Sequence, residues 1–272
     1  MPAITNKQQL LTQTQAALKK RFPLPDPVEA ETPRPLLEEL IFAICREGST
    51  TADATAAYDR LRGTFVDWNE VRVSTVQEVS AALKPLPNSG LRAGWLIGLL
   101  HAVFEMNRSF DLGDMEKKGV KQAAKQIARY FNEKDLKDEK LEQVAKQIER
   151  FKQMNDFAVA WMVQRALGGH AIPLDGPTFR VLRRLGVVEE ADVEEMESLR
   201  ASVEHFIPKT RGPEFTELLS VHAKEICVDK NPRCADCPLK ADCPTGIENL
   251  SKKPAAPGDK DKPADGKPKK PR

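Results

Sequence analysis

Near its C-terminal end the chain carries the segment CVDKNPRCADCPLKADC, residues 227–243. Its cysteines are separated by six, two and five residues. They are Cys227, Cys234, Cys237 and Cys243. Four soft sulfur ligands within so short a stretch can surround one tetrahedral metal ion or one cubic iron–sulfur cluster. The segment therefore predicts a metal-binding loop.

Three chemistries compete for these cysteines. Disulfides are the least favoured, because no apolar signal stretch opens the sequence and thiols seldom oxidise in a reducing cytosol. Paired C-x2-C knuckles would favour zinc, but only Cys234 and Cys237 form such a knuckle. We therefore expect a 4Fe-4S cluster, with zinc as the alternative cofactor.

The composition is that of a chain able to bury a core. Its 272 residues are 40% hydrophobic, and no apolar run is long enough to span a membrane. The net charge of +2 hides a division, because residues 251–272 carry seven Lys and one Arg against three Asp, or +5, leaving −3 elsewhere. This tail has five prolines and no aromatic or branched apolar residue, so we expect it to be disordered. Any contact with nucleic acid must then rest on local basic groups.

Apolar residues recur at helical spacing along the body of the chain, and strand patterns are nearly absent. One such stripe consists of Leu37, Leu40, Ile41 and Ile44. Thr75 and Glu78 match a capping box at the start of another helix. Between residues 115 and 154 two similar stretches, QAAKQIAR and QVAKQIER, predict a pair of helices, and this segment is interpreted as an insertion. The sequence therefore predicts an all-α protein.

The order of the cysteine spacings resembles the cluster loop of endonuclease III and the adenine DNA glycosylases, in the helix-hairpin-helix DNA-repair superfamily. Three further segments extend the resemblance from about residue 36 to residue 245. LLEELIFAICREGSTTADAT, from residue 36, is similar to the first barrel helix. GGHAIPLDGPTFRVLRRLG, from residue 168, is similar to the segment with the catalytic aspartate, and LLSVHAKEIC, from residue 218, to the helix before the cluster.

The resemblance implies two helical domains that flank a DNA-binding cleft. A six-helix barrel with the helix-hairpin-helix would span residues 36–170, and an iron–sulfur cluster domain would combine residues 1–35 with 171–250. Proteins of this kind rotate a damaged or mismatched base out of double-stranded DNA and into the cleft. We therefore expect a base excision repair protein that is monomeric, cytoplasmic and nucleoid-associated.

Family motifs also give roles to single residues. Asp175, in LDGPTFRV, matches the carboxylate that stabilises positive charge on the sugar and helps activate water. An Asp before Gly-Pro-Thr is equally a good helix N-cap. Lys230 and Arg233 in the cysteine loop would contact DNA phosphates. The hairpin falls on FKQMNDFAVAW, residues 151–161, where Asn155 could take the left-handed conformation of the family's glycine.

Two positions depart from the family pattern. Phe157 stands where bifunctional enzymes carry a nucleophilic lysine, and it has no amine to form a Schiff base. Gly48 stands where a strand-wedging glutamine is often found. We therefore expect a monofunctional DNA N-glycosylase without lysine-dependent AP lyase activity. The alternatives are a non-catalytic iron–sulfur DNA-binding protein of the same fold and a zinc-stabilised helical module unrelated to repair.

Overall fold

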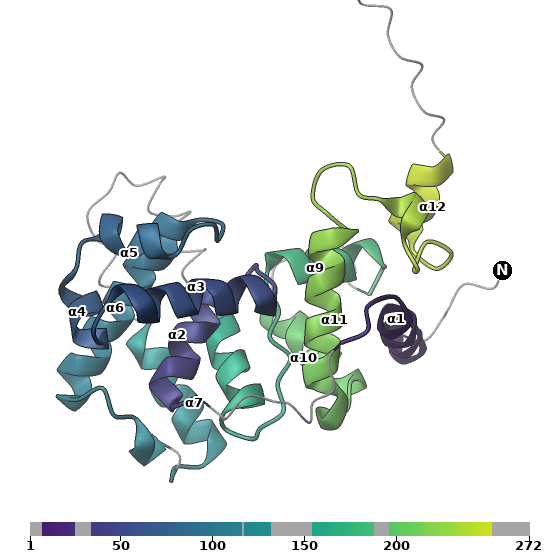
Figure 1. The fold of residues 1–272 in the computed structure, drawn as a ribbon. Coiled ribbons are helices and arrows are strands. Elements are labelled where there is room, and N and C mark those ends of the chain that lie inside the picture. The colour runs from purple at the N-terminus through teal and green to yellow at the C-terminus, as the bar shows by residue number, and fades with distance from the viewer. Residues whose placement is uncertain (1–6, 25–33, 116, 132–153, 188–195, 252–272) are drawn as a thin grey trace, which may run out of the picture.

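A computed structural model describes residues 7–24, 34–115, 117–131, 154–187 and 196–251. Over these residues the protein consists of α-helices and short 3-10 turns, with no strand (Figure 1). This confirms the predicted all-α class. The second of the two similar stretches, residues 143–150, and residues 252–272 of the tail lie outside the described residues.

The first group of helices packs around one cluster of buried side chains, drawn from residues 36–162. Its helices are α2 (Leu36–Arg46), α3 (Thr51–Thr64), α4 (Trp68–Val73), α5 (Val76–Ala82), α6 (Ser89–Asn107), α7 (Val120–Tyr130) and a helix at residues 154–165. The stripe predicted on α2 is buried, and the capping box of Thr75 and Glu78 opens α5 as predicted. Helix periodicity and capping thus explain where these helices form and which face they bury.

The second group joins the two ends of the chain around a separate cluster, drawn from residues 10–22 and 172–243. Its helices are α1 (Lys7–Arg21), α9 (Gly176–Arg184), α10 (Met196–Phe206), α11 (Gly212–Glu225) and α12 (Pro244–Ser251). Helix α11 packs against both α1 and α9 (Figure 1). We call the two groups the first and second lobes. Their separate cores support the predicted domain boundary near residue 170, which stays a prediction.

Ion pairs and hydrogen bonds between largely buried side chains join the two lobes. Arg46, at the end of α2 and inaccessible to solvent, donates from Nη2 to Oε2 of Glu217 on α11 over 3.1 Å. Arg165 donates to Oε1 of the same carboxylate over 2.8 Å, and the Thr51 hydroxyl donates to Oε2 over 2.6 Å. Burial alone would raise the pKa of Glu217, but the guanidinium groups of Arg46 and Arg165 hold it below its usual value. The turn between α2 and α3 is therefore held at the junction of the lobes.

None of the described helices is both long and apolar enough to cross a membrane.

Candidate functional site

Asp175 is the N-cap of α9. Its Oδ1 accepts hydrogen bonds from the backbone N of Thr178 over 2.8 Å and from the Thr178 hydroxyl over 2.7 Å. The Thr178 hydroxyl in turn accepts from the backbone N of Asp175 over 2.9 Å, and Pro177 lies in the first turn. The capping role predicted from the sequence is therefore confirmed, and it takes up one oxygen of the carboxylate.

The other oxygen of Asp175 contacts the first lobe. Oδ2 accepts a hydrogen bond of 2.9 Å from the backbone N–H of Gly48, in the turn between α2 and α3. Gly48 has a φ of +64°, in the left-handed region that favours glycine. Only 3% of Asp175 is exposed. The carboxylate is thus fixed by donors from both lobes.

Asp175 and Gly48 lie on the wall of a cleft between the lobes, which holds about 1100 Å³ of empty space open to solvent. Other cleft-lining residues are Ser49, Asp53, Pro87 and Lys224. Lys224, on α11, forms an ion pair with Asp53, on α3, so one contact joins the two walls. The Ser49 hydroxyl is buried and has no hydrogen-bond partner among the described residues. A cleft with a fixed carboxylate and an unsatisfied hydroxyl is suited to a polar ligand.

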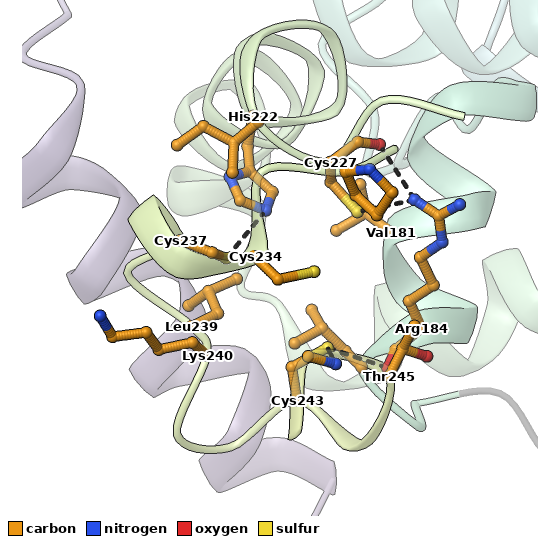
Figure 2. A pocket seen from close by; sticks show the side chains of 14 residues that line it. Val181, Arg184, His222, Cys227, Cys234, Cys237, Leu239, Lys240, Cys243 and Thr245 are labelled. Carbon is orange, nitrogen blue, oxygen red and sulfur yellow. Dashed lines mark hydrogen bonds between the residues drawn. The ribbon is translucent and has the colours of Figure 1, made fainter. Parts of the chain in front are cut away.

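The four cysteines line a single pocket of the second lobe (Figure 2). Cys227 lies two residues after the end of α11, Cys234 and Cys237 lie at a 3-10 turn, and Cys243 directly precedes α12. The helix leading into the loop forms as the sequence predicts. The chain therefore wraps the pocket with one short loop between two helices.

Each of the four sulfurs faces a nitrogen that can donate a hydrogen bond. The pairs are Arg184 Nη1 with Cys227 Sγ (3.4 Å), Asn249 Nδ2 with Cys234 Sγ (3.4 Å), His222 Nε2 with Cys237 Sγ (3.8 Å) and the Gly246 backbone N with Cys243 Sγ (3.3 Å). Burial lowers the pKa of His222 to about 4, so this ring is neutral at pH 7. Donors at all four sulfurs suit thiolates, which accept hydrogen bonds. One contact suits a thiol instead, because Cys243 Sγ also lies 3.1 Å from the carbonyl oxygen of Arg184.

A metal centre in the cysteine pocket would have to be held by thiolates. Among the described residues, no three or more His, Cys, Asp or Glu side chains are grouped so that they could hold a metal ion. Burial raises the pKa of Cys237 to about 11 and also raises the pKa of Cys243. A bound metal must displace these protons, since thiolates are the ligands.

Known proteins resemble this chain in part of its sequence and in most of its fold. No family model matches the chain. An endonuclease III homologue of Encephalitozoon cuniculi (strain GB-M1) is 29% identical over 93 residues, which are 34% of this chain and 38% of that protein. The chain thus matches little more than a third of that relative's length.

Solved structures match over far more of the chain. A non-covalent endonuclease III–DNA complex aligns with a TM-score of 0.59 and 18% identity, over 92% of this chain and 100% of that one. A trapped endonuclease III–DNA covalent intermediate gives 0.58 and 17%, over 91% and 100%. The chain has the endonuclease III fold. A thermostable thymine-DNA glycosylase also aligns, with a TM-score of 0.55 and 17% identity over 89% and 97%. The predicted resemblance to the endonuclease III-like superfamily is confirmed, while identities this low show the fold alone.

The other predicted site residues lie in two separate parts of the structure, the cysteine loop and the helix at residues 154–165. Lys230 and Arg233 are exposed in the cysteine loop. Arg233 donates to the carbonyl oxygen of Glu225 over 3.3 Å and lies 3.5 Å from Asp236. Val228 and Asp229 of the same loop line the cleft. The cysteine loop thus reaches the edge of the cleft. A ligand bound in the cleft could therefore also contact the loop.

The predicted hairpin is described only in part, because residues 151–153 lie outside the described residues. Asn155 lies within the helix at residues 154–165 and so is not left-handed, which corrects the conformation suggested by the resemblance. Phe157 is 1% exposed and stacks on Trp161, with ring centroids 5.9 Å apart. Neither Asn155 nor Phe157 is among the described cleft-lining residues.

Sequence reasoning missed the contacts that fix the turn around Gly48. Arg92 is buried and donates to the carbonyl oxygens of Ile44 and Glu47, and Arg46 donates to that of Ser49. The sequence held one signal for these contacts: Arg46 ends the apolar run LLEELIFAICR, and Arg92 precedes the apolar run of α6. Arginines in such places are seldom fully buried unless they are paired.

Proposed function

We propose that this protein is a DNA N-glycosylase of base excision repair, which hydrolyses the base–sugar bond of a damaged or mispaired nucleotide in double-stranded DNA. The observation that carries the proposal is the fixed Asp175 carboxylate on the wall of a cleft between two helical lobes. Two of the matched endonuclease III structures are complexes with DNA, and a third match is a DNA glycosylase, which supports the same class of activity.

The chemistry follows from the position of the carboxylate. An extruded nucleotide would enter the cleft with its sugar toward Asp175. As the C1′–N bond breaks, its electron pair leaves with the base, and positive charge develops on the sugar. The fixed carboxylate stabilises this charge electrostatically. Water then adds to C1′, and its proton is transferred with the help of the same carboxylate acting as a base.

We further propose that the reaction is monofunctional. A β-elimination would need an amine at C1′ to form a Schiff base, and Phe157 occupies the position of the family's lysine. Lys224 is the one Lys among the described cleft-lining residues, and Asp53 holds its ammonium group in an ion pair. Borohydride treatment of the protein with an abasic duplex should therefore trap no adduct. A high-yield adduct that disappears in Lys224→Arg would instead make Lys224 a nucleophile.

For the cofactor, we propose that Cys227, Cys234, Cys237 and Cys243 hold a 4Fe-4S cluster. The proposal is supported by the four cysteines that line one pocket, by the hydrogen-bonding contacts at their sulfurs and by the single C-x2-C knuckle, which is less typical of a zinc site. The cluster would supply rigid cross-linking of the loop. The loop would then present Lys230 and Arg233 to DNA phosphates with little loss of conformational entropy.

The decisive experiment measures release of free base from a panel of duplexes that each carry one lesion or mismatch. Single-turnover release from at least one substrate, lost in Asp175→Asn, is the expected result. The main alternative is a non-catalytic DNA-binding protein of the same fold, which the buried Phe157 favours. Tight duplex binding without base release from any substrate would establish that alternative.

A further inference from the structure

The hydrogen bonds at Asp175 leave one oxygen with spare capacity. A carboxylate offers about four acceptor positions, two on each oxygen. Oδ1 accepts two bonds from Thr178, whereas Oδ2 accepts one, from the backbone N–H of Gly48. Oδ2 is therefore the oxygen with a lone pair available to a ligand in the cleft, and the Gly48 N–H determines how this oxygen is oriented.

The backbone around Gly48 is unusually constrained. Arg92 holds the carbonyl of Glu47 on one side of the residue, and Arg46 holds the carbonyl of Ser49 on the other. Arg92 also donates from Nε to the carbonyl oxygen of Pro87, over 2.7 Å, on the cleft wall. Both guanidinium groups are almost completely buried. Arg92 thus fixes the peptide group that carries the Gly48 N–H, and Arg46 fixes the peptide group that follows Ser49.

From this geometry we propose that Gly48 is a positioning residue for Asp175, acting through its backbone N–H. Gly48 sets Oδ2 of the catalytic carboxylate toward the sugar of an extruded nucleotide. The left-handed φ of +64° is what directs the N–H at Asp175, and this gives a physical reason for glycine at position 48. The inference rests on the proposed glycosylase function.

The chain offers a matched control for testing this role. A Cβ added at Gly48 would meet only Arg92 Nη2, at an ordinary contact distance of 3.6 Å. Gly168 has a φ of +62° and nothing within 4 Å of an added Cβ. Alanine therefore brings a similar left-handed penalty at both sites, but of these two glycines it is Gly48 that donates to Asp175. Both substitutions keep the backbone N–H, but asparagine tolerates the left-handed conformation better than alanine and so keeps the N–H directed at Asp175.

The experiment compares Gly48→Ala, Gly48→Asn and Gly168→Ala for single-turnover base release, DNA affinity and melting temperature. We expect Gly48→Ala to lower the release rate constant by about tenfold or more, because alanine relieves its left-handed strain by turning the N–H away from Oδ2, and weakening a hydrogen bond to a charged group has an effect of this size. DNA affinity should change little. Gly48→Asn should stay within a few fold of wild type, and Gly168→Ala should lose stability alone.

Equal release rates for Gly48→Ala and Gly168→Ala would overturn the proposal. If Gly48→Ala does not fold, a tenfold loss in folded Gly48→Asn overturns it equally. A second check is the double variant with Asp175→Asn, where Gly48→Ala should have no further effect on the rate, because it acts through the carboxylate. Failure of the proposed function looks different: wild type would release no base, or Asp175→Asn would be fully active.

Discussion

Asp175 combines two demands on a single side chain. As a cap it stabilises the start of α9, and as a cleft residue it presents a fixed negative charge. The structure shows that these demands use different oxygens, Oδ1 for Thr178 and Oδ2 for Gly48. Capping and the proposed catalytic role are therefore compatible, because one oxygen of the carboxylate serves the cap and the other faces Gly48.

The first prediction concerns Asp175→Asn. Asparagine has one acceptor oxygen and one NH2 donor, so either Gly48 or Thr178 would lose its acceptor. We expect a cost of roughly 1–3 kcal/mol in the free energy of unfolding. Loss of the charge should lower base release by about two orders of magnitude or more. Denaturant unfolding and single-turnover assays, at a temperature where both proteins are folded, measure the two effects.

A control variant keeps the charge while weakening the cap. Thr178→Val removes the hydroxyl that donates to Oδ1 but leaves the backbone N–H in place. It should lower stability without an orders-of-magnitude loss of rate. An Asp175→Asn variant that releases base as fast as wild type would show that Asp175 is a cap alone.

At the scale of the element, α9 connects the candidate active site to the cysteine loop. Asp175 caps its N-terminus, and near its other end Arg180 and Arg184 donate to the carbonyl oxygens of Cys227 and Val228. Arg184 also faces the sulfur of Cys227 (Figure 2). The cysteine loop is therefore in direct contact with the helix that carries Asp175.

The second prediction concerns the metal. Four thiolate ligands should give a brown protein with about four irons and four sulfides per chain. Cys237→Ser should lower the iron content and destabilise the second lobe, because metal binding and folding are coupled. Cys45→Ser is the control, since Cys45 is buried in the first lobe and should leave iron unchanged. Colourless protein with stoichiometric zinc after anaerobic purification would contradict the prediction.

The third prediction concerns the basic residues of the cysteine loop. Replacing Lys230 and Arg233 with Ala should weaken binding of all duplexes alike and reduce the salt dependence by roughly one to two units of slope. Arg233 already contacts Glu225 and Asp236, so its share should be the smaller one. The control pair is Lys121 and Lys125, exposed on α7 and not among the cleft-lining residues. If both pairs of substitutions have equal effects, the loop is an ordinary surface.

The elements illustrate what the sequence can predict. The α2 stripe, the α5 capping box and the Asp175 cap depend on neighbours within a turn or two, so local patterns suffice to find them. The hydrogen bond from Gly48 to Asp175 joins residues 127 positions apart. Its donor is a backbone N–H that every residue except proline carries, so no sequence pattern marks it. The same holds for the burial of Arg92, which depends on the surrounding tertiary packing.

For the molecule as a whole, the geometry of the site depends on how the two lobes are joined. The Gly48 N–H belongs to the first lobe and Asp175 to the second, so a small shift between lobes would break their 2.9 Å hydrogen bond. Glu217 on α11 is the acceptor for Arg46 and Arg165 of the first lobe. These ion pairs therefore help to hold the turn that carries Gly48 next to Asp175.

The last prediction concerns the pH dependence of this junction. Burial alone would raise the pKa of Glu217, but the guanidinium groups of Arg46 and Arg165 hold it below its usual value. A depressed folded-state pKa contributes stability that is present above the unfolded value and is lost as pH falls through the folded value. Unfolding free energies measured between about pH 6 and pH 3 should therefore fall more steeply for wild type than for Glu217→Gln.

At pH 7, Glu217→Gln should lower the free energy of unfolding by roughly 3–5 kcal/mol, because Arg46 is left buried without its counter-charge. The comparison is Asp114→Asn, which breaks an exposed ion pair with Lys117 and should not change stability measurably. Base release by folded Glu217→Gln should also fall, since the turn that holds Gly48 loses its anchor. Identical pH profiles for wild type and Glu217→Gln would show that the charge of Glu217 does not stabilise the junction of the lobes.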